Sequence, residues 1–166
     1  SQTAFNELIN RHGRYLYGIA QGLSGNSADA DDLVYIPNAT HGINIVARSL
    51  DLQPGDEILP TDHEYGACDY TWDYACAKTG ATYIHQHIPL PVHSEEKVVE
   101  QLWRGVTPRT KAIYLSHITS STALRLPVET ICQSAKQAGI LTIVDAAHSP
   151  GQIPVDLQAL GADIVF

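Results

Sequence analysis

The sequence has no methionine among its 166 residues and only three cysteines, Cys68, Cys76 and Cys132. A primary translation product begins with methionine, so we expect a trimmed chain or a part of a longer one. Three scattered cysteines do not predict a disulfide framework, which needs paired cysteines at recognisable spacings. We therefore expect a reducing, cytoplasmic setting.

Positive charge and long apolar runs are also scarce. Lys and Arg number 10 against 18 Asp and Glu, which gives a formal net charge of −8. An acidic surface repels a phosphate backbone, so we expect no nucleic-acid partner. Because no stretch approaches the length of an apolar membrane span and the N-terminus has no signal pattern, we expect no membrane partner either.

Short apolar runs alternate with stretches of helical periodicity along the chain. The patterns predict helices at 5–19, 40–50, 64–78, 94–104, 128–138 and 157–160, and strands at 33–36, 57–59, 82–85, 112–115, 140–144 and 162–166. Such alternation is typical of a mostly parallel sheet covered on both faces by helices. We predict an α/β fold, a three-layer sandwich, without an internal domain boundary. Ligands in such sheets bind at the carboxyl ends of the strands.

The first strand end with chemically useful residues is Asn38-Ala39-Thr40-His41-Gly42. Small residues let a ligand approach the backbone, and the free N–H groups of a helix N-terminus attract an anion. This segment predicts a phosphate cradle, with the alternative that Thr40 only caps the helix. The usual glycine-rich nucleotide fingerprints are absent from the sequence.

Two further strand ends carry aromatic or hydroxyl side chains. In the segment Thr61–Gly66, an imidazole (His63) or a phenol (Tyr65) could stack on a flat ligand. The alternative is a helix cap at Asp62 beside a partly exposed His63. The segment Ser116–Thr122 carries a run of hydroxyls, which would bind a ligand or form an ordinary turn.

Asp145 ends the strand expected at 140–144, and His148 follows three residues later. A buried carboxylate is costly unless a cation or several donors meet it, although a lone Asp here can also be structural. We also weighed a metal site, because three histidines lie close in sequence. No Cys or carboxylate completes a recognisable ligand set, so we expect no metal. The three histidines are His85, His87 and His93.

Together and in this order, these segments resemble the class V aminotransferase family of fold-type-I enzymes that use pyridoxal 5'-phosphate (PLP). The resemblance covers about residues 31–166 and is strongest to the isopenicillin N epimerase-like branch, beside the cysteine desulfurase-like branch. It implies a PLP-dependent transferase-like large domain, of which residues 1–166 are an incomplete part, with the small C-terminal domain absent and a homodimer as the assembly. The segments that carry it are Pro37-Asn38-Ala39-Thr40 with Gly42, Thr61–Ala67, Ser116–Ser120, Asp145–Gly151 and Leu160–Asp163.

The resemblance also implies a role for residues of the first two segments. Thr40 and the backbone of Ala39 and His41 would hold the cofactor phosphate at the helix N-terminus. His63 would stack on the pyridine ring and fix its plane. By this reading His63 is one of two catalytic residues.

The resemblance implies that Asp145 is the other catalytic residue. It would pair with the pyridine nitrogen and keep it protonated, which makes the ring an electron sink. His148 would reach the phenolic oxygen of the ring. Ser120, or else Thr119, lies where desulfurases carry an Asn near that oxygen, and this difference favours the epimerase-like branch.

The family's Schiff-base lysine is expected a few residues beyond Phe166, and none of the four lysines present matches its motif. We therefore expect the front part of an enzyme that acts on an amino acid through a Cα carbanion, as an epimerase, a C–S lyase or desulfurase, or an aminotransferase. The chain alone would be inactive. The alternatives are a non-catalytic remnant that keeps the scaffold, and a nicotinamide-binding Rossmann domain, which lacks its glycine fingerprint.

Overall fold

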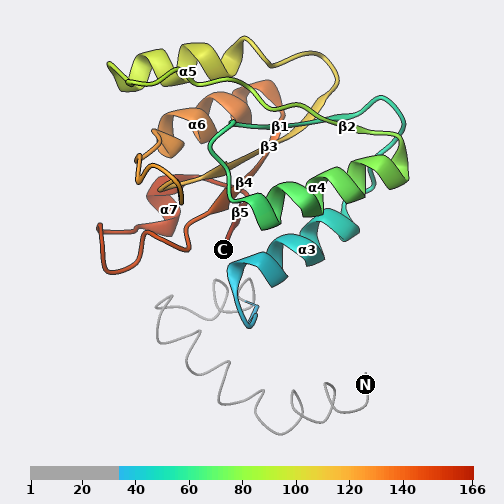
Figure 1. Cartoon of the computed structure of the whole chain (residues 1–166), viewed down its shortest axis with the longest axis horizontal. Coiled ribbons are helices and arrows are strands. Elements are labelled where there is room, and N and C mark those ends of the chain that lie inside the picture. The colour runs from blue at the N-terminus through green and yellow to red at the C-terminus, as the bar shows by residue number, and fades with distance from the viewer. Residues whose placement is uncertain (1–33) are drawn as a thin grey trace, which may run out of the picture. The chain divides into compact units, whose positions relative to one another are not determined.

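The computed structural model describes residues 34–166, of which Asn38–Phe166 form a compact unit. A five-stranded parallel sheet runs through this unit in the order β2-β1-β3-β4-β5 (Figure 1). The predicted α/β class and the mostly parallel sheet are therefore confirmed. The helix predicted at 5–19 lies outside the described residues.

The strands are short, and their order creates a switch point in the sheet. The chain passes from β1 to its outer neighbour β2 and then returns past β1 to form β3. Connections consequently leave β1 and β3 in opposite directions, which in open α/β sheets marks the place where ligands bind. The strands are β1 (Glu57–Pro60), β2 (Thr82–Tyr83), β3 (Thr110–Ser116), β4 (Leu141–Asp145) and β5 (Ile164–Val165).

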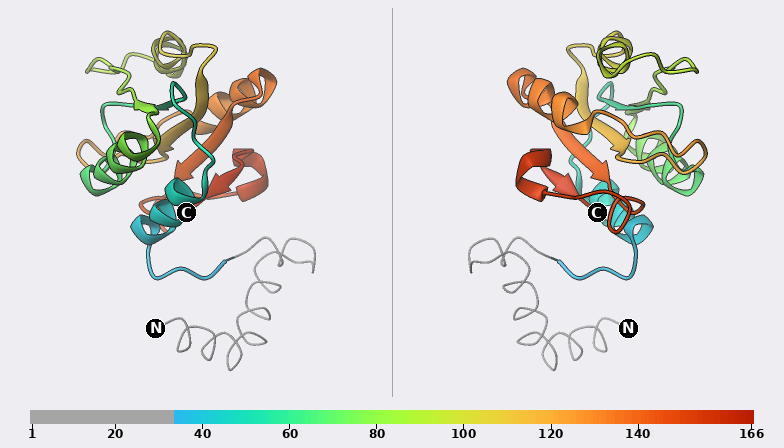
Figure 2. Two further views of the ribbon diagram at one scale, coloured as in Figure 1. Left: turned by 90° about the vertical axis from the view of Figure 1, so that its right-hand side faces the viewer. Right: turned by 90° about the vertical axis from the view of Figure 1, so that its left-hand side faces the viewer.

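Helices cover both faces of the sheet, so the predicted three layers are present. In Figures 1 and 2, α3 and α4 lie on one face, and α5 and α6 lie on the other. The helices α4 and α6 end at Gly80 and Gly139, whose left-handed backbone (φ 78° and 70°) suits glycine. The helices are α3 (Ala39–Ser49), α4 (Gly66–Thr79), α5 (Glu95–Trp103), α6 (Val128–Ala138) and α7 (Leu157–Leu160).

Alternate residues of the central strands fill two separate cores. Tyr114 of β3 packs with Trp72 under α3 and α4, with ring centroids 5.7 Å apart. The neighbouring Ile113 and Leu115 point the other way and pack with Leu102 under α5 and α6. Because both faces are covered, the middle residues of these strands are mostly apolar on both sides, which is the pattern that the sequence shows.

Two local predictions are wrong. No strand forms at 34–36, because a strand needs a neighbouring backbone to pair with and an apolar run alone does not supply one. The cap of α3 is Asn38 and not Thr40: the Asn38 side chain accepts a hydrogen bond from the backbone N–H of His41 at 2.8 Å. The helix therefore begins one residue earlier than predicted.

The remaining boundaries differ mainly at the sheet edges. The strands predicted at 82–85 and 162–166 pair only over Thr82–Tyr83 and Ile164–Val165. In the part of the chain that the structure describes, no helix has both the length and the apolar character that crossing a membrane requires.

Candidate functional site

A cavity of about 280 Å³ opens at the carboxyl ends of β3 and β4, beside the N-terminus of α3. Segments far apart in the sequence meet there because the register pairs Ser116 of β3 with Asp145 of β4, so that both strands end at the same level. Five of the seven predicted site residues line this cavity. Its full lining is Asn38, Ala39, Thr40, Tyr65, Ser116, Ser120, Asp145, Ala147 and His148.

Asp145 is the buried carboxylate of the cavity, with 7% of its surface exposed. Its Oδ1 accepts a hydrogen bond from the Ala147 N–H at 2.9 Å, and its Oδ2 lies 4.0 Å from the Cys68 thiol. Burial raises the pKa of Asp145, while the Ala147 N–H and nearby His148 act to lower it. Among residues 34–166, no salt bridge includes Asp145.

Glu57, at the opposite end of the sheet, shows how this protein otherwise satisfies a buried carboxylate. Glu57 is 3% exposed, and the guanidinium of Arg109 donates to its Oε1, with the Arg109 Nε at 2.8 Å. The Thr107 hydroxyl donates to the other oxygen. Asp145 has one backbone donor and no such cation in the described residues. A ligand that brings a protonated nitrogen into the cavity fits this carboxylate.

Two predicted residues do not line the cavity. The backbone N–H of His41 is already bonded to the Asn38 side chain, and the His41 side chain is exposed. His63 is turned to the next loop, with its Nε2 2.9 Å from the carbonyl oxygen of Ile88. Tyr65, the residue directly before α4, is the member of this segment that lines the cavity. The phenol weighed beside the imidazole in the sequence is the signal that points to it.

The structure also separates the two hydroxyl candidates after β3. Thr119 is buried. Its hydroxyl forms hydrogen bonds within the turn, to the Thr122 hydroxyl at 2.6 Å and from the Leu124 N–H at 2.9 Å. Ser120 lines the cavity instead. Part of the segment is therefore the ordinary turn of the alternative interpretation, and Ser120 lies in the wall of the cavity.

The histidines weighed as metal ligands have other neighbours. The His87 ring is bonded to the Asp62 carboxylate, and the His85 ring lies edge-on to Tyr83 with centroids 4.7 Å apart. Within the described residues no group of three or more His, Cys, Asp or Glu side chains is arranged to hold a metal ion. None of the four lysines lines the cavity.

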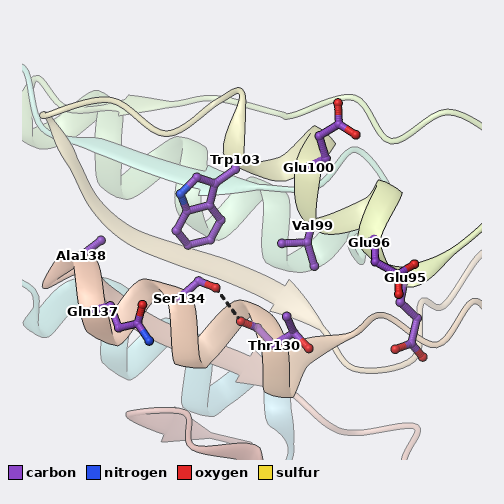
Figure 3. A pocket seen from close by; sticks show the side chains of 9 residues that line it. All are labelled: Glu95, Glu96, Val99, Glu100, Trp103, Thr130, Ser134, Gln137 and Ala138. Carbon is purple, nitrogen blue, oxygen red and sulfur yellow. Dashed lines mark hydrogen bonds between the residues drawn. The ribbon is translucent and has the colours of Figure 1, made fainter.

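A larger hollow of about 730 Å³ lies on the opposite face of the sheet, between α5 and α6 (Figure 3). Glutamates gather at its rim, but Glu100 is paired with Lys97 and Arg104 on its own helix. None of the motif residues reaches it. Its lining is Glu95, Glu96, Val99, Glu100, Trp103, Thr130, Ser134, Gln137 and Ala138.

Known proteins are similar to this chain in both sequence and fold. Residues 24–166 match the family model for Aminotransferase class-V. An isopenicillin N epimerase from Amycolatopsis lactamdurans is 36% identical over 139 residues, which cover 82% of this chain and 35% of the epimerase. A probable cysteine desulfurase from Vibrio cholerae serotype O1 is 34% identical over 137 residues, which cover 80% of this chain and 33% of the desulfurase. The chain thus spans about a third of the length of these relatives.

Solved structures extend this similarity to the fold. The cystine C–S lyase C-DES, in complex with its reaction product cysteine persulfide, has a TM-score of 0.82 and 26% identity, covering 96% of this chain and 42% of the lyase. A variant of that lyase with glycine covalently linked to its PLP cofactor has a TM-score of 0.79 and 25% identity, with the same coverage. All five motif segments lie within the family match, and the chain belongs to the class-V aminotransferase family of PLP-dependent enzymes.

Proposed function

We propose that this chain is the front part of the PLP-binding large domain of an enzyme that acts on an amino acid through a carbanion at its Cα. The observation that carries the proposal is Asp145, a buried carboxylate that has no salt-bridge partner among the described residues and lies at a cavity where two central strands end. A protonated pyridine nitrogen would supply that cation, and the ring would then withdraw electrons from the substrate. Asp145 would hold the proton on this nitrogen.

The N-terminus of α3 would bind the cofactor phosphate. Thr40 would donate its hydroxyl and, with Ala39, backbone N–H groups, and the helix dipole would favour the negative charge. The His41 N–H would join them only when the Asn38 side chain releases it. The position of Asn38 in the cavity lining supports such an exchange.

Tyr65 is our assignment for the flat contact with the pyridine ring, because its side chain lines the cavity. The stacking role of His63 stays a prediction that would require its ring to leave the Ile88 carbonyl. Ser120 and His148, both in the lining, would face the phenolic oxygen of the ring.

The type of reaction at the Cα carbanion depends on chemical groups that residues 1–166 supply only in part. Relatives named as epimerase, desulfurase and C–S lyase all fit a Cα carbanion, and sulfur-containing amino acids are the substrates we propose first. We also propose that the Schiff-base lysine follows these residues in the chain, and that the enzyme is a cytoplasmic homodimer. Three buried, free cysteines support a reducing setting.

The test is the intact mass of the full-length protein after incubation with PLP and reduction with borohydride, which traps a lysine–cofactor bond. One cofactor adduct per chain, together with turnover of a sulfur-containing amino acid, is the expected result. PLP that binds but leaves no adduct would favour the non-catalytic remnant. That alternative has the cost of keeping Asp145 buried without a permanent partner. No PLP binding at all would overturn the proposal.

A further inference from the structure

Glu64 and Ser116 meet across the switch point of the sheet. Glu64 lies in the segment that follows β1, and Ser116 is the last residue of β3. The Glu64 Oε2 accepts two hydrogen bonds from Ser116, one from its N–H and one from its hydroxyl, both at 2.7 Å. The Thr61 hydroxyl donates to Oε1. One carboxyl therefore joins the segment after β1 to the end of β3, beside one wall of the cavity.

One partner of this contact lines the cavity, and the other is next to a residue that lines it. Ser116 lines the cavity directly, and Glu64 is followed in the chain by Tyr65, which also lines it. Tyr65 occupies the cap position of α4 but makes no side-chain capping bond there. The bonds of Glu64 therefore anchor the Tyr65 segment to the sheet end.

The surroundings of Glu64 make this contact sensitive to pH. Burial raises the pKa of Glu64 to about 7, although the Thr61 and Ser116 hydrogen bonds act against the shift and Asp69 on α4 adds to it. The phenols of Tyr83 on β2 and Tyr114 on β3 also face this carboxyl. An ionised carboxylate accepts stronger hydrogen bonds than a protonated one, so the contact with Ser116 tightens as pH rises through neutrality.

We propose that Glu64 is a positioning residue of the cofactor site, which holds Tyr65 and Ser116 in place for the bound ring by joining their segments across the switch point. The proposal rests on the proposed function, because the ring that Tyr65 faces is that of PLP. Glu64 itself would not contact the reacting atoms.

Three variants of the full-length protein test this role. E64A removes the contact, while E64Q keeps an acceptor for both Ser116 donors but cannot ionise. D163A is the matched control, because Asp163 accepts from the N–H and hydroxyl of Thr142, each at 2.8 Å, in the same pattern but away from the cavity. The readouts are the dissociation constant for PLP, the visible circular dichroism of bound PLP, and backbone hydrogen exchange of residues 61–66 and 116.

We expect E64A to bind PLP about tenfold more weakly, as the loss of one net hydrogen bond predicts, with a reduced dichroism signal and faster exchange. E64Q should restore affinity to within about threefold of the wild type, and it should abolish the change in dichroism between about pH 6 and 8. D163A should lower thermal stability but leave both cofactor readouts unchanged.

Unchanged affinity, dichroism and exchange in E64A would overturn the proposal. So would a pH profile of E64Q that matches the wild type, which also decides the question if E64A does not fold. A wild-type protein that binds no PLP would instead refute the proposed function. The exchange rates, measured without cofactor, would in that case still show whether Glu64 anchors the Tyr65 segment.

Discussion

Two buried carboxylates of the sheet, Glu57 and Asp145, differ in how their charges are compensated. Glu57 has a guanidinium and a hydroxyl, so its charge is compensated within the protein. In the described residues Asp145 accepts one backbone N–H, its second oxygen lies 4.0 Å from a thiol, and no salt bridge compensates its charge. An uncompensated buried charge is destabilising, and such groups are concentrated at functional sites. This contrast between single residues is the physical basis of the cofactor assignment.

Asp145→Ala should therefore separate cofactor binding from stability. Without the carboxylate, the pyridine nitrogen loses a charged hydrogen-bond partner, and PLP retention should fall roughly 10- to 100-fold. The apo protein should be as stable as the wild type or more so, because a buried charge is removed. Equilibrium dialysis against PLP and urea unfolding of the apo form measure the two effects. Unchanged retention would show that the assigned role of Asp145 is wrong.

His117 gives a second prediction at the residue scale. The side chain is 1% exposed, neither ring nitrogen has a hydrogen-bond partner in the described residues, and burial lowers its pKa from 6.5. Glu129 opposes this shift and Arg125 adds to it. The unfolded chain thus binds a proton that the folded chain resists. The stability that His117 contributes is complete above pH 6.5 and is lost as pH falls.

His117→Leu should consequently flatten the decrease in unfolding free energy from about pH 7 to pH 5. Glu64, with its raised pKa, changes stability in the opposite direction over part of this range, so the difference between wild type and variant is the quantity to measure. Replacement of the exposed His93 by Ala is the control and should leave the slope unchanged. Equal slopes for wild type and H117L would contradict the prediction.

At the scale of elements, the start of α3 decides how the phosphate end of the site is built. Asn38 is in extended conformation and satisfies the His41 N–H, which would otherwise point into solvent or toward a ligand. Thr40, the cap predicted from sequence, is instead the second residue of the helix and lines the cavity. The cap and the phosphate of the proposed cofactor would therefore compete for the same helix N-terminus.

Asn38→Ala should lower the unfolding free energy of the apo protein by about 1 kcal/mol, the usual cost of a lost cap. Ser94→Ala at the start of α5 is the comparison. Its capping bond to the Lys97 N–H is long, at 3.4 Å, and exposed, so a smaller loss is expected. Chemical denaturation of both variants measures the two losses of unfolding free energy. A larger loss for Ser94→Ala than for Asn38→Ala would contradict the prediction.

At the scale of the whole molecule, the sheet separates the site from half of the core. The cavity opens on the side of α3 and α4, while Leu102 is fully buried beneath α5 on the other face. Leu102→Ala should cost about 2–5 kcal/mol of unfolding free energy. It should leave PLP affinity unchanged, because none of the residues that line the cavity belongs to that core.

The exposed Leu157, which is 53% accessible, provides the matched control for this change. Leu157→Ala should alter stability by less than about 0.5 kcal/mol. Differential scanning calorimetry and a PLP titration of both variants measure the comparison. A loss of PLP affinity in L102A with a folded protein would show that the two faces are coupled.

Local chemistry was sufficient to predict several elements from the sequence. The helix at 128–138 was predicted to the residue, since its apolar positions repeat at helical spacing and Gly139 provides a left-handed end. The strand at 33–36 was wrong because pairing depends on a distant neighbour. Residues from four of the five motif segments line one cavity, while His41 and His63 lie outside its lining.

The sequence by itself determined the α/β class, the parallel sheet and the family, because periodicity, glycine caps and ordered motifs are local features of the sequence. Only the tertiary structure decided that Tyr65 and not His63 lines the cavity, and that Asp145 has no salt-bridge partner among residues 34–166. These depend on the register of β3 against β4 and on the contact of Glu64 with Ser116. Such contacts join residues that are dozens of positions apart, so no local pattern specifies them.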